Sequence, residues 1–178
     1  MIYLWILVGI VGRLVIHIPD VTPLTSLCLL APTVFSKRLS FLMIGVTLVL
    51  SDLCLHFLFH YAVFGSWTIF SYTGWFAMGL LGWLLAKNMT FTRSLFFTSC
   101  AAIIFWIWTD FGTWIATNIY PHTAQGLIDC YSAALPFLRN GLLGSLVWTS
   151  VLIACLKFHS RLIFSTRQFL YSTARWMI

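Results

Sequence analysis

The sequence has few charged residues and no glutamate. Of its 178 residues, 8% are charged, whereas an ordinary soluble domain has about 25%. Hydrophobic residues make up 61%, and the mean hydropathy is +0.96. Because so few polar groups could not cover a surface that faces water, the composition excludes a soluble globular protein. It predicts a single all-α domain embedded in lipid.

Sequence motifs for common enzyme chemistry are also missing. The chain has no phosphate-binding P-loop, no HExxH zinc motif and no GxSxG nucleophile motif. Its five cysteines show no CxxC or other metal-type spacing. The net charge is +6, but the basic residues are scattered between apolar runs, which argues against a nucleic-acid partner. We therefore expect neither an enzyme nor a bound cofactor.

The apolar runs and their breaks predict six membrane-spanning helices, one of them short. The predicted spans are 2–18, 24–36, 39–64, 67–86, 94–119 and 137–156. A half-buried segment, 126–135, precedes Pro136, and we expect the proline to separate it from the last span. The second run is too short for a hydrocarbon core of about 30 Å. It should therefore lie in a recess lined by protein.

The basic residues predict how the spans are oriented. If the first residue is cytoplasmic, the cytoplasmic connections and tail hold eight of the ten basic residues: Lys37, Arg38, Lys87, Arg93, Lys157, Arg161, Arg167 and Arg175. Positively charged residues accumulate on the cytoplasmic side of membrane proteins. This distribution predicts a multi-pass protein of a bacterial-type inner membrane, with both termini in the cytoplasm.

Residues 157–178 differ from the rest of the chain, which leaves 1–156 as the transmembrane domain. Phe158, Leu162, Phe169 and Trp176 recur at near-helical spacing, with basic residues on another face. This pattern is typical of an amphipathic helix that lies on an anionic membrane surface. The alternative is a frayed tail that only its positive charge holds at the membrane.

Ionisable side chains inside a membrane are costly, so each is a candidate for a functional site. Here they gather in the outer half of the predicted spans. Arginine can bind a carboxylate or phosphate through two hydrogen bonds, while aspartate and asparagine accept hydrogen bonds from amines and amides. We therefore expect a polar cavity, open to the outside, that binds a small molecule through Arg13, Asp20, Asp52, His56, Asp110, Trp114, Arg139 and Asn140.

Two alternatives remain open at this point. Arg13 and Arg139 could simply neutralise Asp52 and Asp110 as ion pairs, in a membrane assembly factor or partner subunit that transports nothing. The histidines also suggest a metal-ion carrier.

His56 and His60, with His17, are weak metal candidates. His60 lies two helical turns from Asp52, a rise of about 12 Å, so Asp52, His56 and His60 cannot all reach one ion. We assign no metal.

Several short motifs resemble those of one family. They are Arg13 with Pro19-Asp20-x-Thr22-Pro23, Ser51-Asp52-Leu53, Trp108-Thr109-Asp110-Phe111-Gly112-x-Trp114, and a later run containing Tyr120-Pro121, Gly126-Leu127, Cys130-Tyr131, Ala134-Leu135-Pro136-Phe137, Arg139-Asn140 and Gly144. Over residues 10–156 the chain resembles small, uncharacterised bacterial membrane proteins described as transport proteins. It is more distantly similar to the substrate-binding S components of energy-coupling-factor vitamin transporters.

The resemblance implies uptake of a vitamin-like or nucleobase-like molecule from the outer side. Its partners would be a scaffold membrane subunit and ATPases. Two positions depart from the pattern, because Asp20 and Asp110 stand where the resemblance implies asparagine. Both add negative charge to the expected cavity. Residues 2–18 also offer only Gly9 and Gly12 where S components often carry an Ala-x-x-x-Ala face for docking their scaffold.

Overall fold

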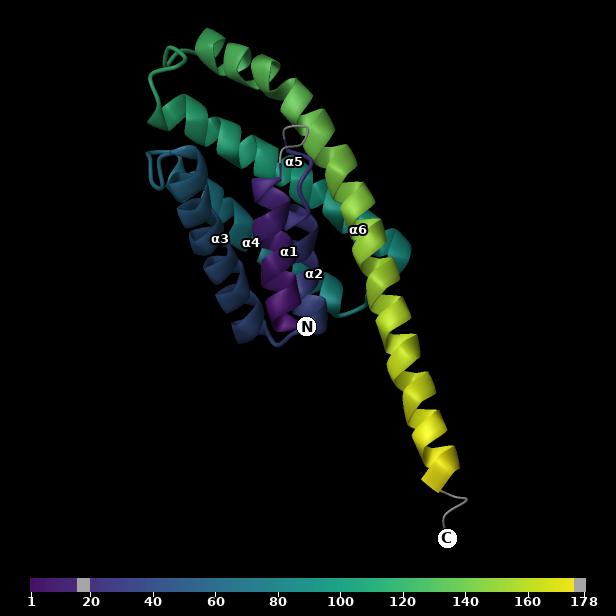
Figure 1. Cartoon of the computed structure of the whole chain (residues 1–178). Helices are drawn as coiled ribbons and strands as arrows, with labels where there is room; N and C mark the ends of the chain where they lie inside the picture. Colours follow the sequence, from purple (N-terminus) through teal and green to yellow (C-terminus); the bar gives the residue numbers. More distant parts are fainter. Residues whose placement is uncertain (16–19, 175–178) are drawn as a thin grey trace.

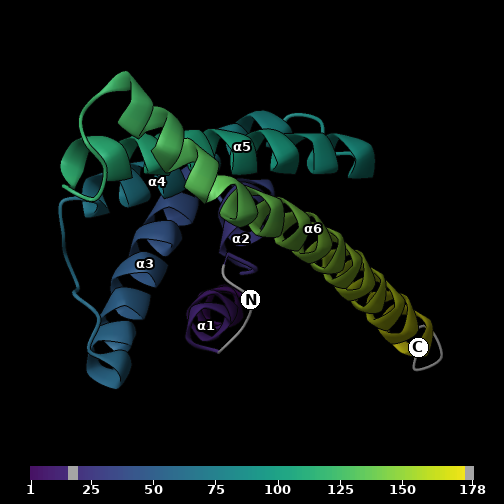
Figure 2. The same cartoon turned by 90° about the horizontal axis from the view of Figure 1, so that it is seen from above.

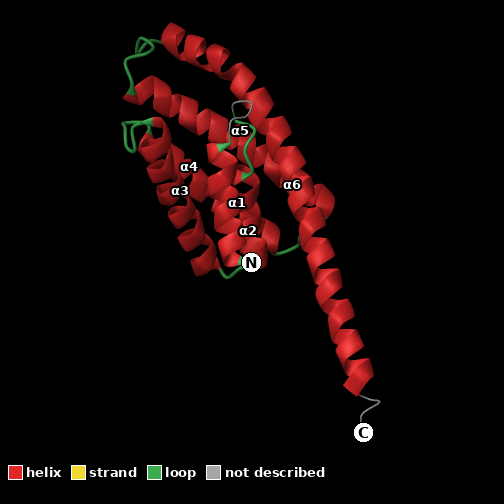
Figure 3. Cartoon of the chain, in the orientation of Figure 1, coloured by secondary structure: helices red, strands yellow, loops and turns green. Residues whose placement is uncertain are grey.

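The computed structural model describes the backbone of residues 1–15 and 20–174, and the side chains of those ranges up to residue 158. This part of the chain is entirely helical, with no strand (Figures 1 and 3). The helices are α1 (Ile2–Leu14), α2 (Leu24–Val34), α3 (Lys37–Phe59), α4 (Thr68–Ala86), α5 (Phe91–Ala116) and α6 (Ala124–Ala174). The predicted all-α class is confirmed.

Successive helices run in alternating directions between the two ends of the bundle (Figure 1). The chain begins at the end where α2 meets α3, and α6 also points toward that side. Lys37, the first residue of α3, and Lys87, the residue that follows α4, lie at this end, and the connection that contains Asp20 lies at the opposite end. A cytoplasmic location of both termini agrees with this geometry and stays a prediction.

Four segments are long and apolar enough to cross a membrane: α3, α4, α5 and residues Ala124–Phe158 of α6. By contrast, α1 has 13 residues and α2 has 11, which correspond to about 20 and 17 Å. The helix in the predicted first span, 2–18, ends at Leu14, and residues 16–18 of that span lie outside the described part. The described residues form six helices, of which four have the length of a full span.

The outside of the bundle is apolar. Only 22–28% of each candidate span is buried inside the protein. Large hydrophobic side chains such as Leu42, Phe57 and Phe96 are exposed instead. A surface of this kind needs lipid around it, because monomeric soluble proteins do not expose such large apolar areas. The chain is therefore a membrane protein.

Helix α2 lies inside the bundle and contacts all five other helices (Figure 2). Every residue from Leu24 to Pro32 is buried. A helix too short for the bilayer is thus enclosed by protein, as its length predicts. Close packing on one side depends on Gly82 of α4, where an added Cβ would lie 2.1 Å from the carbonyl oxygen of Leu29.

Buried hydroxyl groups tie α2 to its neighbours. The Oγ1 of Thr149 in α6 donates to Ser26 Oγ of α2 at 2.9 Å, and it lies 2.9 Å from Thr98 Oγ1 of α5. The Ser26 hydroxyl donates in turn to the carbonyl oxygen of Ser145 at 2.9 Å. Hydrogen bonds between helices stabilise membrane bundles, where apolar side chains gain little by leaving lipid.

Helix α6 corrects one prediction. We expected a break at Pro136 and a separate helix from residue 157, but one helix of 51 residues runs through both positions. A proline removes only one backbone hydrogen bond, and membrane helices tolerate it where neighbouring helices support the chain. The helix curves in its first half and extends past the other helices at its far end (Figure 1). Whether its last turns lie on a membrane surface stays a prediction.

The α3 boundaries also differ from the predicted span, 39–64. The helix ends at Phe59 because His60 adopts a left-handed conformation with φ of 58°. Such a residue commonly terminates a helix. Residues 60–67 then form a connection, and this places Tyr61 and Trp67 near the site described below.

Candidate functional site

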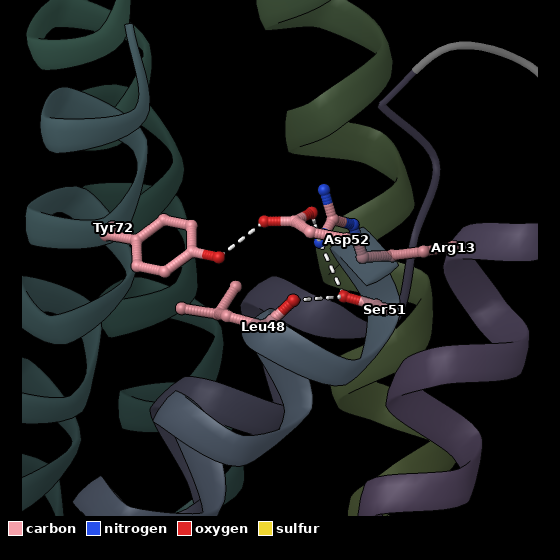
Figure 4. Close-up of polar contacts among 5 residues, drawn as sticks. All are labelled: Arg13, Leu48, Ser51, Asp52 and Tyr72. Atoms are coloured by element: carbon pink, nitrogen blue, oxygen red, sulfur yellow. Dashed lines mark hydrogen bonds and ion pairs between the residues drawn. The ribbon is translucent and has the colours of Figure 1, made fainter. Parts of the chain in front are cut away.

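Arg13 and Asp52, both expected from the sequence, form an ion pair. Arg13 Nη1 lies 2.7 Å from Asp52 Oδ1, and the two side chains are 24% and 13% exposed. The same Nη1 donates to Ser51 Oγ at 2.6 Å, and the Tyr72 hydroxyl donates to Asp52 Oδ2 at 2.5 Å (Figure 4). The cluster joins α1, α3 and α4. Each oxygen of the Asp52 carboxylate therefore has a partner from another helix.

Local structure holds this cluster in place. Arg13 is in the last turn of α1, where the helix dipole favours a positive charge. The Ser51 hydroxyl donates to the carbonyl oxygen of Leu48 at 2.9 Å, so its lone pairs face Arg13. Ser51 is fully buried. The Arg13 side chain is thus bound by two neighbouring residues of α3.

A cavity of about 370 Å³, here called the central cavity, opens beside this cluster. It lies between α4, α5, α6 and the connection from α1 to α2. Its polar lining consists of Arg13, Asp20, Thr22, Thr25, Ser71, Thr109, Asp110, Thr113 and Ser145, and its apolar lining consists of Trp75, Ala102, Phe105, Trp106, Phe137, Leu138, Gly141 and Leu142. Three of the sequence-predicted residues, Arg13, Asp20 and Asp110, therefore meet at one cavity.

A second cavity, of about 300 Å³, lies on the other side of Arg13. It contains Asp52 and Tyr72, and the connection after α3 covers it with Tyr61 and Trp67. The two cavities share Arg13, Ser71 and Trp75, so they are direct neighbours. The Arg13–Asp52 pair thus stands between them.

Asp110 is in a different situation from Asp52. Among the described residues, its carboxylate has no hydrogen bond and no ion pair; only its backbone oxygen accepts a hydrogen bond, from Cys130 Sγ at 3.5 Å. The expected neutralising partner, Arg139, is exposed and lines neither cavity. Of the two ion pairs expected from the sequence, the described structure therefore contains the Arg13–Asp52 pair alone.

Other sequence-predicted residues lie away from both cavities. His56 is exposed, and its Nδ1 lies 2.8 Å from the carbonyl oxygen of Tyr61. Trp114 Nε1 donates to the carbonyl oxygen of Pro121 at 3.1 Å, which fixes the connection after α5. Asn140 is half-buried but lines neither cavity.

No metal site is visible in the described part of the chain, where no three His, Cys, Asp or Glu side chains gather. His17, one of the weak metal candidates, lies outside the described residues. His56 and His60 are both exposed, next to the turn that ends α3. The side chains of residues 1–15 and 20–158 thus offer no cluster for a metal-ion carrier.

Comparison with family models matches residues 1–167 to a family of unknown function, DUF6580. The chain belongs to the DUF6580 family. No curated protein matches it, and no solved structure matches it. Membership of DUF6580 therefore brings no assigned activity, and nothing in these comparisons links the chain to S components.

Several residues of this site are absent from the sequence prediction, among them three residues of α4. The Tyr72 hydroxyl binds Asp52, and Ser71 and Trp75 line both cavities. These three lie in a span without any charged residue. Trp75 follows Ser71 by four residues and Tyr72 by three, so a helix places it near both, but nothing in the sequence shows which face is inward.

Proposed function

We propose that this membrane protein binds a vitamin-like or nucleobase-like small molecule in the central cavity and takes part in its uptake from the outer side of a bacterial-type inner membrane. One observation carries the proposal. Arg13, Asp20 and Asp110, which come from three different elements, line a single cavity in a bundle whose outside is apolar. Intramembrane ionisable groups around a cavity are typical of substrate pathways.

The size and lining of the central cavity suit a small ligand. Small-molecule sites usually measure about 300–1,000 Å³ and combine apolar walls with a few polar groups. Trp75, Phe105 and Trp106 supply flat apolar walls. Trp106 is held by a hydrogen bond from its Nε1 to the carbonyl oxygen of Ala134 at 3.1 Å. A planar ring could stack on such fixed aromatic walls.

The position of the cavity supports capture from the outer side. Asp20 and Thr22, in the connection between α1 and α2, contribute to the lining. Irregular backbone at membrane depth is tolerated where it is buried in protein or lines a watery cavity. This connection lies at the end of the bundle opposite Lys37 and Lys87, and their positive charge predicts that their end faces the cytoplasm.

The proposal includes no catalytic step and no cofactor. Because the sequence has no P-loop, energy for uptake would come from partner ATPases with a scaffold subunit, or from an ion gradient. Gly9 and Gly12 cannot form the docking face, since Gly9 packs against Thr47 and Gly12 against Pro23. A scaffold that binds α1 would instead contact its exposed side chains, among them Leu4 and Leu7.

A thermal-shift screen of the purified protein in detergent tests the proposal. Vitamins, nucleobases, amino acids and metal ions form the panel. A ligand at 100 times its dissociation constant adds about 2.7 kcal/mol of stability. Gly141→Leu is the variant that should block binding, because its larger side chain would fill the cavity. The fold should tolerate the change, since an added Cβ at this position lies 3.6 Å from Asp20 Cβ, an ordinary contact distance.

We expect a compound that stabilises the wild type and loses its effect in Gly141→Leu. A panel without any such compound would contradict the proposal and favour a membrane assembly or partner subunit. The Arg13–Asp52–Tyr72 cluster fits that second function, because it links three helices whether or not a ligand binds. Stabilisation by a metal ion alone would favour the metal-ion carrier.

A further inference from the structure

We propose that the ligand of the central cavity carries a cationic hydrogen-bond donor, such as a protonated amine or an amidinium, attached to a flat ring. The inference rests on the proposed function and adds the chemical class of the substrate. Three features of the lining support it: the charges that remain after internal pairing, the hydrogen-bonding state of the hydroxyl groups, and the position of the aromatic rings.

The ion pairs of the site leave negative charge facing the cavity. Arg13 is the one cation among the described residues of the lining, and Asp52 already neutralises it at 2.7 Å. Asp110 lines the same space, and among the described residues its carboxylate has no hydrogen bond or ion pair. An anionic ligand would meet a guanidinium whose charge Asp52 already neutralises, next to the Asp110 carboxylate. The same arrangement favours a cationic ligand.

The hydroxyl groups next to Asp110 present oxygen lone pairs rather than protons. Thr109 Oγ1 donates to the carbonyl oxygen of Phe105 at 2.9 Å, and Thr113 Oγ1 donates to that of Thr109 at 3.1 Å. Because each hydroxyl has a single proton, which the α5 backbone already uses, only its lone pairs can serve a ligand. Asp110 lies between these two threonines in sequence. This wall of the cavity therefore accepts hydrogen bonds and favours a ligand that donates them.

Aromatic rings complete a cation site. Trp75 and Phe105 lie with ring centroids 4.3 Å apart, and both line the cavity together with Trp106. The face of an aromatic ring attracts a cation, and the attraction is stronger where water is excluded. The same faces offer a stacking surface for the ring of the ligand. Charge, hydrogen bonding and shape thus favour the same class of molecule.

Three probes that share one ring test the inference: tryptamine, tryptophol and indole-3-acetate. At neutral pH they are cationic, neutral and anionic. Their affinities for the purified full-length protein can be measured by calorimetric titration. Because hydrogen bonds to charged groups are the strong ones, we expect tryptamine to bind at least about tenfold tighter than tryptophol. Indole-3-acetate should bind weakest.

Asp110→Asn should remove most of the preference for tryptamine, and Asp110→Glu should retain it. Asp129→Asn is the matched control, because Asp129 is exposed, accepts a hydrogen bond from Gln125 at 2.9 Å and lines neither cavity. It should leave all three affinities unchanged. If Asp110→Asn fails to fold, the comparison of the three probes on the wild type decides alone.

The possible failures can be told apart. Equal affinity for the three probes, or tightest binding of indole-3-acetate, would overturn the cationic ligand while leaving a small-molecule cavity in place. A preference for tryptamine that Asp110→Asn does not change would also overturn it, because the cation would then bind elsewhere. Binding of none of the three, together with an empty screen, would contradict the proposed function itself.

Discussion

A methyl group added at Gly82 would meet the backbone of α2. A Cβ there would lie 2.1 Å from the carbonyl oxygen of Leu29 and 3.1 Å from Pro32 Cδ. Real Cβ atoms essentially never come within 3.0 Å of such an atom. The two helices must therefore move apart by about 1 Å, and the fully buried Leu29 has no free space to give.

The size of the effect follows from this geometry. Overpacking of a tight core costs about 1–3 kcal/mol, and the better helix propensity of alanine returns at most about 1 kcal/mol. We expect Gly82→Ala to lower the free energy of unfolding by about 2 kcal/mol. Gly45→Ala is the matched control, since the nearest atom to its Cβ is Phe76 Cζ at an ordinary 3.6 Å. That change should be neutral or stabilising.

Unfolding of the purified protein in mixed micelles, followed by tryptophan fluorescence, measures both variants under the same conditions. The difference between Gly82→Ala and Gly45→Ala is the quantity of interest, because the chemical change is the same at both sites. Equal stability of the two variants would refute the close packing of α2 against α4. It would also show that the approach of α4 to α2 does not depend on Gly82.

Three further predictions concern the polar groups. Arg13→Met and Asp52→Leu should each lower the free energy of unfolding by about 2–3 kcal/mol. The double variant should lose less than the sum of the two single losses, because it leaves no unpaired charge. Additive losses in a double-mutant cycle would contradict the ion pair. Thr149→Val should lower the free energy of unfolding by about 1 kcal/mol, because it removes hydrogen bonds between helices. Thr92→Val, the matched control at an exposed site, should leave that free energy unchanged. Asp110→Ala should abolish uptake of the screened ligand by cells while membrane insertion, measured by fractionation, stays normal; full uptake would exclude Asp110 from the ligand site.

The sequence predicts the elements of this fold better than their packing. The apolar runs and the basic connections locate α4 to within one residue, since charged residues and loops cannot lie in lipid. The shortness of α2 is enough to expect a protein-lined recess. The continuity of α6 through Pro136 was not predictable, because tolerance of a proline depends on the support that neighbouring helices give.

For the site residues, the sequence predicts how deep each side chain lies in the membrane but not which side of its helix the side chain occupies. Asp110 and Arg139 were expected at a similar depth, and opposite charge suggested a pair. The structure directs Asp110 into the central cavity and leaves Arg139 exposed. Tyr72 and Trp75 carried no signal at all, because aromatic residues are common throughout such spans.

The central claim is that a watery cavity opens to the outer side and holds a small molecule. Thiol labelling at position 113 in intact cells tests this claim most directly. Thr113→Cys places a thiol in the cavity lining, and the wild type gives the background from its five native cysteines. We expect a membrane-impermeant reagent to label the new cysteine from outside, and the screened ligand to slow the labelling. A folded Thr113→Cys protein that reacts only after permeabilisation, or whose labelling no screened ligand slows, would contradict the account.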